Sequence, residues 1–166
     1  MSTPPRWLDD EEQQAWRAFV SAGRLLIDRL DRELQSSAGM PMTYYEVLVQ
    51  LSEAPGRSLR MSELARRSLS SPSRLSHAVA RLEELGWVRR QACPSDRRGA
   101  FAVLTDEGFA AIEAAAPGHV EGIRNHLLDQ LSPEQVGQLR QIGEALSRHL
   151  LPGAEPAECT EEHGGC

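Results

Sequence analysis

Helix start signals in the middle of this chain leave little freedom in how that region can fold. Ser62 can cap a short helix over residues 63–67, because a serine oxygen accepts a backbone N–H of the first helical turn. Ser71-Pro72 repeats the signal, with a cap followed by a proline at the first helical position, where the missing N–H costs nothing. The sequence therefore predicts a short helix, a turn and a second helix that runs to Leu85.

Two β-prone runs follow at residues 87–91 and 100–104, after Gly86 has ended the second helix. The loop over residues 93–99 is polar and turn-forming, so the two runs are predicted to form a hairpin. Four arginines add positive charge to it: Arg89, Arg90, Arg97 and Arg98. This order of elements predicts a helix-turn-helix with a β wing, in which the second helix lies in the DNA major groove.

Charge is unevenly distributed along the chain. The net charge is −6, and all 18 basic residues are arginine. Residues 57–98, here called the basic segment, hold ten arginines and four acidic residues, whereas residues 1–56 carry a net charge of −4 and residues 99–166 one of −8. Such an island is typical of a module that binds a polyanion. The absence of lysine excludes Schiff-base enzymes and the lysine-dependent phosphate loop.

The second helix of the motif has two distinct faces. One apolar stripe is formed by Leu75, Ala78, Val79 and Leu82, and a neighbouring polar face by Ser73, Arg74, His77 and Arg81. Arginine can donate to guanine O6 and N7 or to phosphate, and serine and histidine supply shorter donors. We therefore expect the polar face to contact DNA.

Helical patterning on both sides of the motif makes the expected fold class mainly α with a small β wing. Apolar spacings of three and four predict a long helix over residues 10–36. Thr43 followed by Glu46 forms a capping box for a helix that ends near Glu53.

Two further helices are expected after the wing. Thr105 can cap the first of them, whose apolar phase continues to Leu131 as one helix bent at Pro117-Gly118. Ser132 opens the second with a capping box, and its apolar stripe ends at Leu150.

Three stretches of the motif resemble the MarR family of winged-helix transcription regulators. They are Met61-Ser62-Glu63-Leu64-Ala65, Leu82-Glu83-Glu84-Leu85-Gly86-Trp87-Val88-Arg89-Arg90, and the segment from Asp96-Arg97-Arg98-Gly99 through Leu104-Thr105-Asp106-Glu107-Gly108. The resemblance implies that Arg98 of the wing enters the minor groove and that Asp96 holds the basic residues in place. Arg97 is included in the expected DNA-binding set.

The resemblance also implies a homodimer, and the apolar faces of the first helix and the last two helices fit this assembly. The expected division of the chain is a dimerisation helix at 1–38, a winged helix-turn-helix domain at 43–108, further dimerisation helices at 109–151 and a disordered tail at 152–166. A twofold dimer predicts a palindromic site with half-sites about 10 base pairs apart.

Family members often bind small, frequently aromatic effectors, and Trp16, Phe19, Tyr44 and Tyr45 are candidates for such a pocket. Core packing is the alternative for aromatic residues at helical spacing. Cys93 lies among wing arginines that favour a thiolate, although an incidental exposed cysteine is the alternative.

No catalytic motif, metal or cofactor is expected. Cys159, His163 and Cys166 could hold zinc but lack a fourth ligand, and an unliganded tail is the alternative. An acidic N-terminal stretch and the lack of a long apolar run predict no signal peptide and no membrane span, which leads us to expect a cytoplasmic protein.

The sequence thus predicts a non-enzymatic, sequence-specific DNA-binding transcription regulator: an effector-responsive repressor that binds a palindromic operator as a homodimer. The alternative is a winged-helix dimer that binds proteins instead of DNA.

Overall fold

The computed structural model describes residues 5–93 and 96–151, and of residues 93 and 96–98 the backbone alone. The chain divides into two compact units, residues 1–126 and 127–166, which are described separately here. Among the described residues, no helix is both long and apolar enough to cross a membrane. The domain boundaries and the cytoplasmic location expected from the sequence stay predictions.

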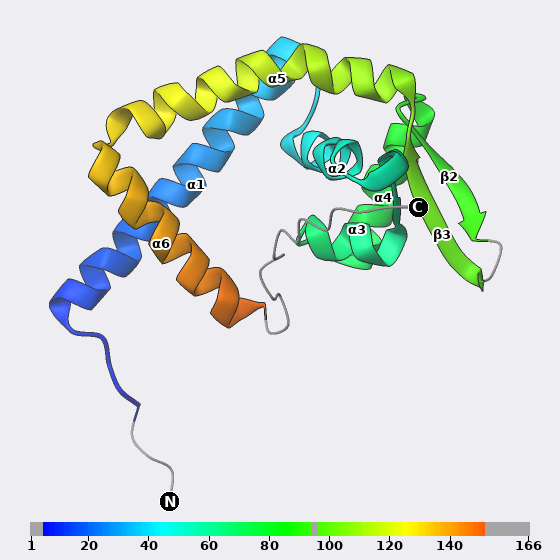
Figure 1. Ribbon diagram of the computed structural model, residues 1–166. Helices are drawn as coiled ribbons and strands as arrows, with labels where there is room; N and C mark the ends of the chain where they lie inside the picture. Colours follow the sequence, from blue (N-terminus) through cyan, green and yellow to red (C-terminus); the bar gives the residue numbers. More distant parts are fainter. Residues whose placement is uncertain (1–4, 94–95, 152–166) are drawn as a thin grey trace, which may run out of the picture. The chain divides into compact units, whose positions relative to one another are not determined.

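Helices dominate the first unit, which also contains a small antiparallel sheet (Figure 1). Its helices are α1 (Asp10–Ala38), α2 (Met42–Ser52), the 3-10 turn Pro55–Arg57, α3 (Met61–Arg67), α4 (Pro72–Glu84) and α5 (Asp106–His126). The strands β1 (Ser58–Arg60), β2 (Val88–Cys93) and β3 (Asp96–Leu104) lie in the order β1-β3-β2. The expected fold class is confirmed.

One hydrophobic core joins the end of α1 to the helix-turn-helix and the wing. Leu30 and Leu34 of α1 belong to the same buried cluster as Leu48 of α2, Leu82 of α4 and Ile112 of α5. The described part of this core contains no buried polar or charged residue. Hydrophobic burial is therefore the main force that holds α1 to the winged elements.

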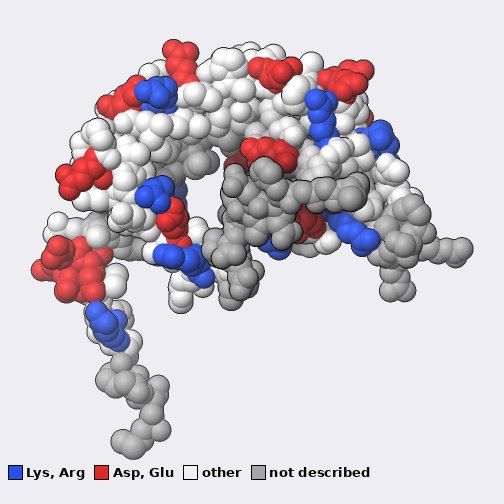
Figure 2. Space-filling model, in the orientation of Figure 1, with Lys and Arg blue, Asp and Glu red and all other residues white. Residues whose placement is uncertain are grey.

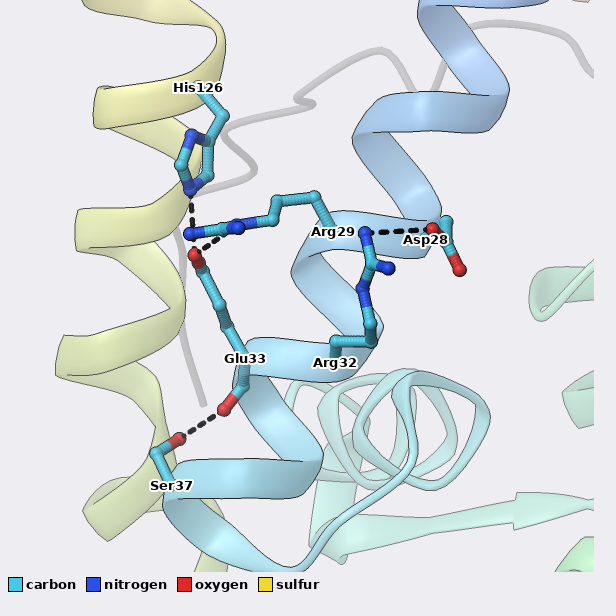
Figure 3. Close-up of polar contacts among 6 residues, drawn as sticks. All are labelled: Asp28, Arg29, Arg32, Glu33, Ser37 and His126. Atoms are coloured by element: carbon cyan, nitrogen blue, oxygen red, sulfur yellow. Dashed lines mark hydrogen bonds and ion pairs between the residues drawn. The ribbon is translucent and has the colours of Figure 1, made fainter.

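A polar contact adds to this packing where α1 meets α5 (Figure 3). Glu33 Oε1 lies 2.8 Å from His126 Nε2 and accepts a 2.6 Å bond from Arg29 Nε. These two hydrogen bonds, first that of His126 and then that of Arg29, lower the pKa of the Glu33 carboxyl. A neighbouring pair on α1, Arg32 with Asp28 at 2.9 Å, stays within the helix.

Two helix starts differ from the sequence prediction. Helix α2 begins at Met42 after Pro41, so Thr43 is not its cap, and the Met42 N–H donates instead to Asp31 Oδ1 of α1 at 2.7 Å. Helix α3 begins at Met61, so Ser62 is not its cap. Strand β1, which the sequence analysis missed, runs directly into α3, and its last residue Arg60 takes the extended cap position.

The other predicted starts are confirmed. Ser71 Oγ accepts the Arg74 N–H at 3.3 Å, with Pro72 as the first helical residue of α4. Thr105 Oγ1 accepts the Gly108 N–H at 3.0 Å at the start of α5. Helix α5 continues through Pro117 as one helix, but it ends at His126 rather than at Leu131.

The second unit contains the 3-10 turn Leu128–Gln130 and α6 (Pro133–Leu150). Ser132 and Gln135 form both halves of the predicted capping box, with bonds of 3.2 and 2.8 Å. Along α6 the apolar stripe is largely open to solvent, with Ile142 53% and Leu150 70% exposed.

The junction between the wing and α5 depends on Gly108. A Cβ atom at this position would lie 2.1 Å from the Trp87 carbonyl oxygen, which is main chain and cannot move aside. Thr105 Oγ1 fixes the same junction by donating to the Gly86 carbonyl at 2.7 Å.

We expect Gly108→Ala to lower the free energy of unfolding by about 1 to 3 kcal/mol, because the added methyl group overpacks this contact. Gly118→Ala in the same helix is the control, since a Cβ there meets nothing within 4 Å. The control should be neutral or stabilising by up to about 1 kcal/mol. Urea unfolding of both variants measures the difference, and equal stability would contradict the close contact.

Candidate nucleic-acid interface

Helix α4 is set into the first unit by the apolar stripe that the sequence predicted. Leu75, Ala78, Val79 and Leu82 are all buried, none more than 5% exposed. The four residues of the predicted DNA face, Ser73, Arg74, His77 and Arg81, are all exposed. Burial of one stripe thus leaves a polar edge of α4 open to solvent.

Residues in the first turn of α4 are the best placed of this helix to contact a bound nucleic acid. Ser71 caps the helix, Pro72 begins it, and Arg74 follows at once. Arg74 and His77 form no ion pair within the described part of the chain. Their donors therefore remain available to base edges or phosphates.

Several other arginines of the basic segment are bound to carboxylates. Glu63 of α3 accepts from Arg66 at 2.6 Å and from Arg67 at 2.7 Å, and these bonds lower the pKa of Glu63 to about 2. Arg81 pairs with Glu84 on α4. Surface pairs of this kind are weak, so such an arginine can exchange its carboxylate for a phosphate.

Two arginines of the segment have structural partners. The Arg57 guanidinium lies 3.7 Å from the centre of the Phe109 ring and 3.2 Å from Asp106, which joins the base of β1 to α5. Arg90 of β2 binds Glu83 and Ser76 of α4. Sequence reasoning missed both arrangements, because neither partner lies near its arginine in a recognisable spacing.

The charge asymmetry persists in the folded first unit. Acidic side chains predominate along α5 in the view of Figure 2, and Asp106, Glu107, Glu113 and Glu121 of this helix are all exposed. The arginines of the basic segment lie instead on the 3-10 turn, α3, α4 and the three strands. An anionic partner is therefore attracted to the helix-turn-helix and not to α5.

The side chains predicted to act in the wing, those of Asp96, Arg97 and Arg98, lie outside the described part of the structure, as does that of Cys93. The backbone of residues 96–98 belongs to β3, so the expected hairpin is present. Cys159, His163 and Cys166 also lie outside the described residues, within which no group of three metal-ligating side chains occurs.

The four aromatic candidates for an effector pocket lie in different environments. Trp16 and Phe19 are 58% and 56% exposed on α1, whereas Tyr45 is buried, with its ring 4.5 Å from that of His119. Tyr44 is half-buried against the core. An open groove of about 610 Å³ between α1 and α2 is lined by other residues: Gly23, Arg24, Ile27, Asp28, Asp31, Met42, Thr43 and Glu46. The aromatic pocket stays a prediction.

We expect Arg74→Ala to lose about 1 to 3 kcal/mol of discrimination at one base position, because an arginine in the first turn of α4 can reach a base edge. Affinity for a panel of single-base operator variants measures this loss. Arg140→Ala serves as control, since Arg140 is equally a helical arginine but lies on α6 and pairs with Glu144 at 2.9 Å. Equal weakening on every sequence would reassign Arg74 to a phosphate contact.

Comparisons with known proteins agree with this geometry. A model of the MarR family matches residues 38–99. The HTH-type transcriptional regulator PecS of Dickeya dadantii is 33% identical over 134 residues, which are 80% of each chain. Among solved structures is that of Sco3205 of Streptomyces coelicolor, a MarR family transcriptional regulator in complex with DNA. It is 52% identical in sequence, with a TM-score of 0.86, and the match covers 93% of this chain and 97% of the Sco3205 chain. AbsC from the same organism is 45% identical with a TM-score of 0.82, over 88% and 98%.

Proposed function

Because this chain belongs to the MarR family of winged-helix, DNA-binding transcription regulators, we propose that it is an effector-responsive repressor that binds a palindromic operator as a homodimer. Regulators of this family are non-enzymatic, in agreement with the expectation that the chain is not an enzyme.

The observation that carries the proposal is the open polar edge of α4. Arg74 and His77 are exposed in its first two turns, beside a serine cap and next to a buried apolar stripe. A helix held in this way can enter the major groove with its N-terminal residues toward the bases. Arg97 and Arg98, with Asp96 as their support, would add the contact of the wing. The DNA-bound state of Sco3205 supports this arrangement.

Exposed apolar side chains on α1 and α6 support assembly with a second copy. Trp16, Phe19 and Ile27 on α1 are each more than half exposed, and so are Ile142 and Leu150 on α6. Water-exposed apolar stripes of this length favour burial against a like surface. A twofold dimer would place two α4 helices about one DNA turn apart, on a palindromic operator.

The groove between α1 and α2 supports response to an effector. It is bounded by residues 23–31 of α1 and by the start of α2, the same two helices that the Asp31–Met42 bond joins. A ligand bound there with different affinities in two arrangements of α1 and α2 would shift the population between them. The spacing of the two α4 helices would change with it, and the operator would be released.

A gel-shift titration with the DNA upstream of the chain's own gene tests the proposed function. We expect retardation that is specific to part of that DNA and that weakens steeply as salt is raised, because phosphate contacts release counterions. Absence of any retardation at low salt would favour the alternative, in which the winged dimer binds a protein.

Truncation after Leu131 should abolish stable dimers, because it removes the apolar stripe of α6. Each fully buried leucine, isoleucine or valine contributes roughly 1.5 to 3 kcal/mol, and the symmetry of a dimer doubles the effect. Operator affinity should fall with the loss of the second half-site. Sedimentation measures the assembly, with a chain ending at Leu151 as the control that keeps α6. A truncated dimer that persists at micromolar concentration would assign the interface to α1 alone.

A further inference from the structure

Arg90 belongs to the basic segment, but its side chain is turned toward the protein. Its Nη2 donates to the Ser76 carbonyl oxygen at 2.9 Å and lies 3.3 Å from Ser76 Oγ. Its Nε lies 3.3 Å from Glu83 Oε2, and its backbone N–H donates to Glu83 Oε1 at 2.8 Å. Both the main chain and the side chain of one wing residue are therefore fixed to α4.

Arg90 and its two partners, Ser76 and Glu83, lie on two elements that would meet DNA at different places. Ser76 and Glu83 lie about two helical turns apart on α4, so they share one face of that helix. Arg90 lies in the middle of β2, where it pairs with Ala102 of β3. We call this connection between α4 and β2 the bracket; it consists of Ser76, Glu83 and Arg90.

The bracket differs from the arginine pairs of the segment that lie within a single helix. Arg81 and Glu84 are both more than 60% exposed and belong to one helix, so their pair connects no other element. The side chains of Arg90 and Glu83 are 36% and 32% exposed. Glu83 lies on α4 and Arg90 on β2, so their pair spans the turn at Gly86 and connects two elements. Arg90 would have to break the bonds at Nε and Nη2 before it could turn these two nitrogens to a phosphate.

We propose that the bracket positions the wing on α4 and so sets the distance between the major-groove helix and the wing, with Arg90 and Glu83 as positioning residues and not DNA contacts. This inference rests on the DNA binding proposed for α4 and the wing. A wing fixed before binding spares the ordering cost of the second contact, which favours DNA that fits both elements at once.

Glu83→Gln and Glu84→Gln test the proposal as a matched pair of neighbours on α4. Each variant removes one negative charge near the DNA, which by charge alone strengthens binding to any sequence. We expect Glu83→Gln instead to weaken binding to a duplex selected by the unmodified protein by roughly tenfold, because a charge-assisted bond of the bracket is lost. Affinity for an unrelated duplex should stay within about twofold of its original value. Glu84→Gln should not weaken binding to either of the two duplexes.

Arg90→Ala provides a second measurement that separates a positioning role from a phosphate contact. The bracket predicts a loss on the selected duplex with an unchanged salt slope on the unrelated one, whereas a lost phosphate contact would lower that slope by about one. Thermal melting of each variant checks that the unit stays folded.

Hydrogen exchange in the absence of DNA gives a readout that does not depend on the proposed function. The Arg90 amide should exchange faster in Glu83→Gln than in Glu84→Gln. Only Glu83→Gln replaces the carboxylate that accepts this amide's hydrogen bond with a weaker, neutral acceptor. Equal exchange, or a Glu83→Gln variant that binds the selected duplex as tightly as Glu84→Gln, would overturn the bracket. An unmodified protein that binds no duplex would instead contradict the proposed function.

Discussion

The hydrophobic core that the last turns of α1 share with the winged elements is the contact on which the first unit depends. Leu30 and Leu34 are buried in it, whereas the preceding turns of α1 expose Trp16 and Phe19. One helix is therefore part of the DNA-binding unit at its end and presents an apolar surface along the rest. A displacement of that surface would be transmitted to α2 and α5, because close-packed protein interiors have low compressibility and transmit strain.

Local chemistry explains which parts of the fold could be predicted from the sequence. The start of α4 and both faces of that helix followed from Ser71-Pro72 and from apolar spacing, which act within a few residues. The start of α2 was predicted wrongly because its capping acceptor, Asp31, lies 11 residues away on another helix. Strand β1 has three residues, too few for an alternating pattern to emerge.

The candidate interface shows the same division between local and tertiary information. Charge counting correctly located the basic segment, and the helical period correctly separated the exposed face with Arg74 from the buried stripe. Counting could not tell which arginines are held by carboxylates of the fold. Arg90 and Arg74 contribute equally to the charge count, but among the described residues only Arg90 is bonded to another element. That difference depends on pairings formed only after folding.

The bond from the Met42 N–H to Asp31 makes the start of α2 depend on the orientation of α1. Helix α2 follows Pro41 and has no side-chain cap of its own, so its first turn is completed by an oxygen that belongs to α1. A rotation of α1 that carried Asp31 away would leave an amide of that turn without its acceptor and would fray the helix from its beginning. The connection between the two helices is thus stiffened by the start of α2 itself, because any change in the angle of α1 would unwind the first turn of α2.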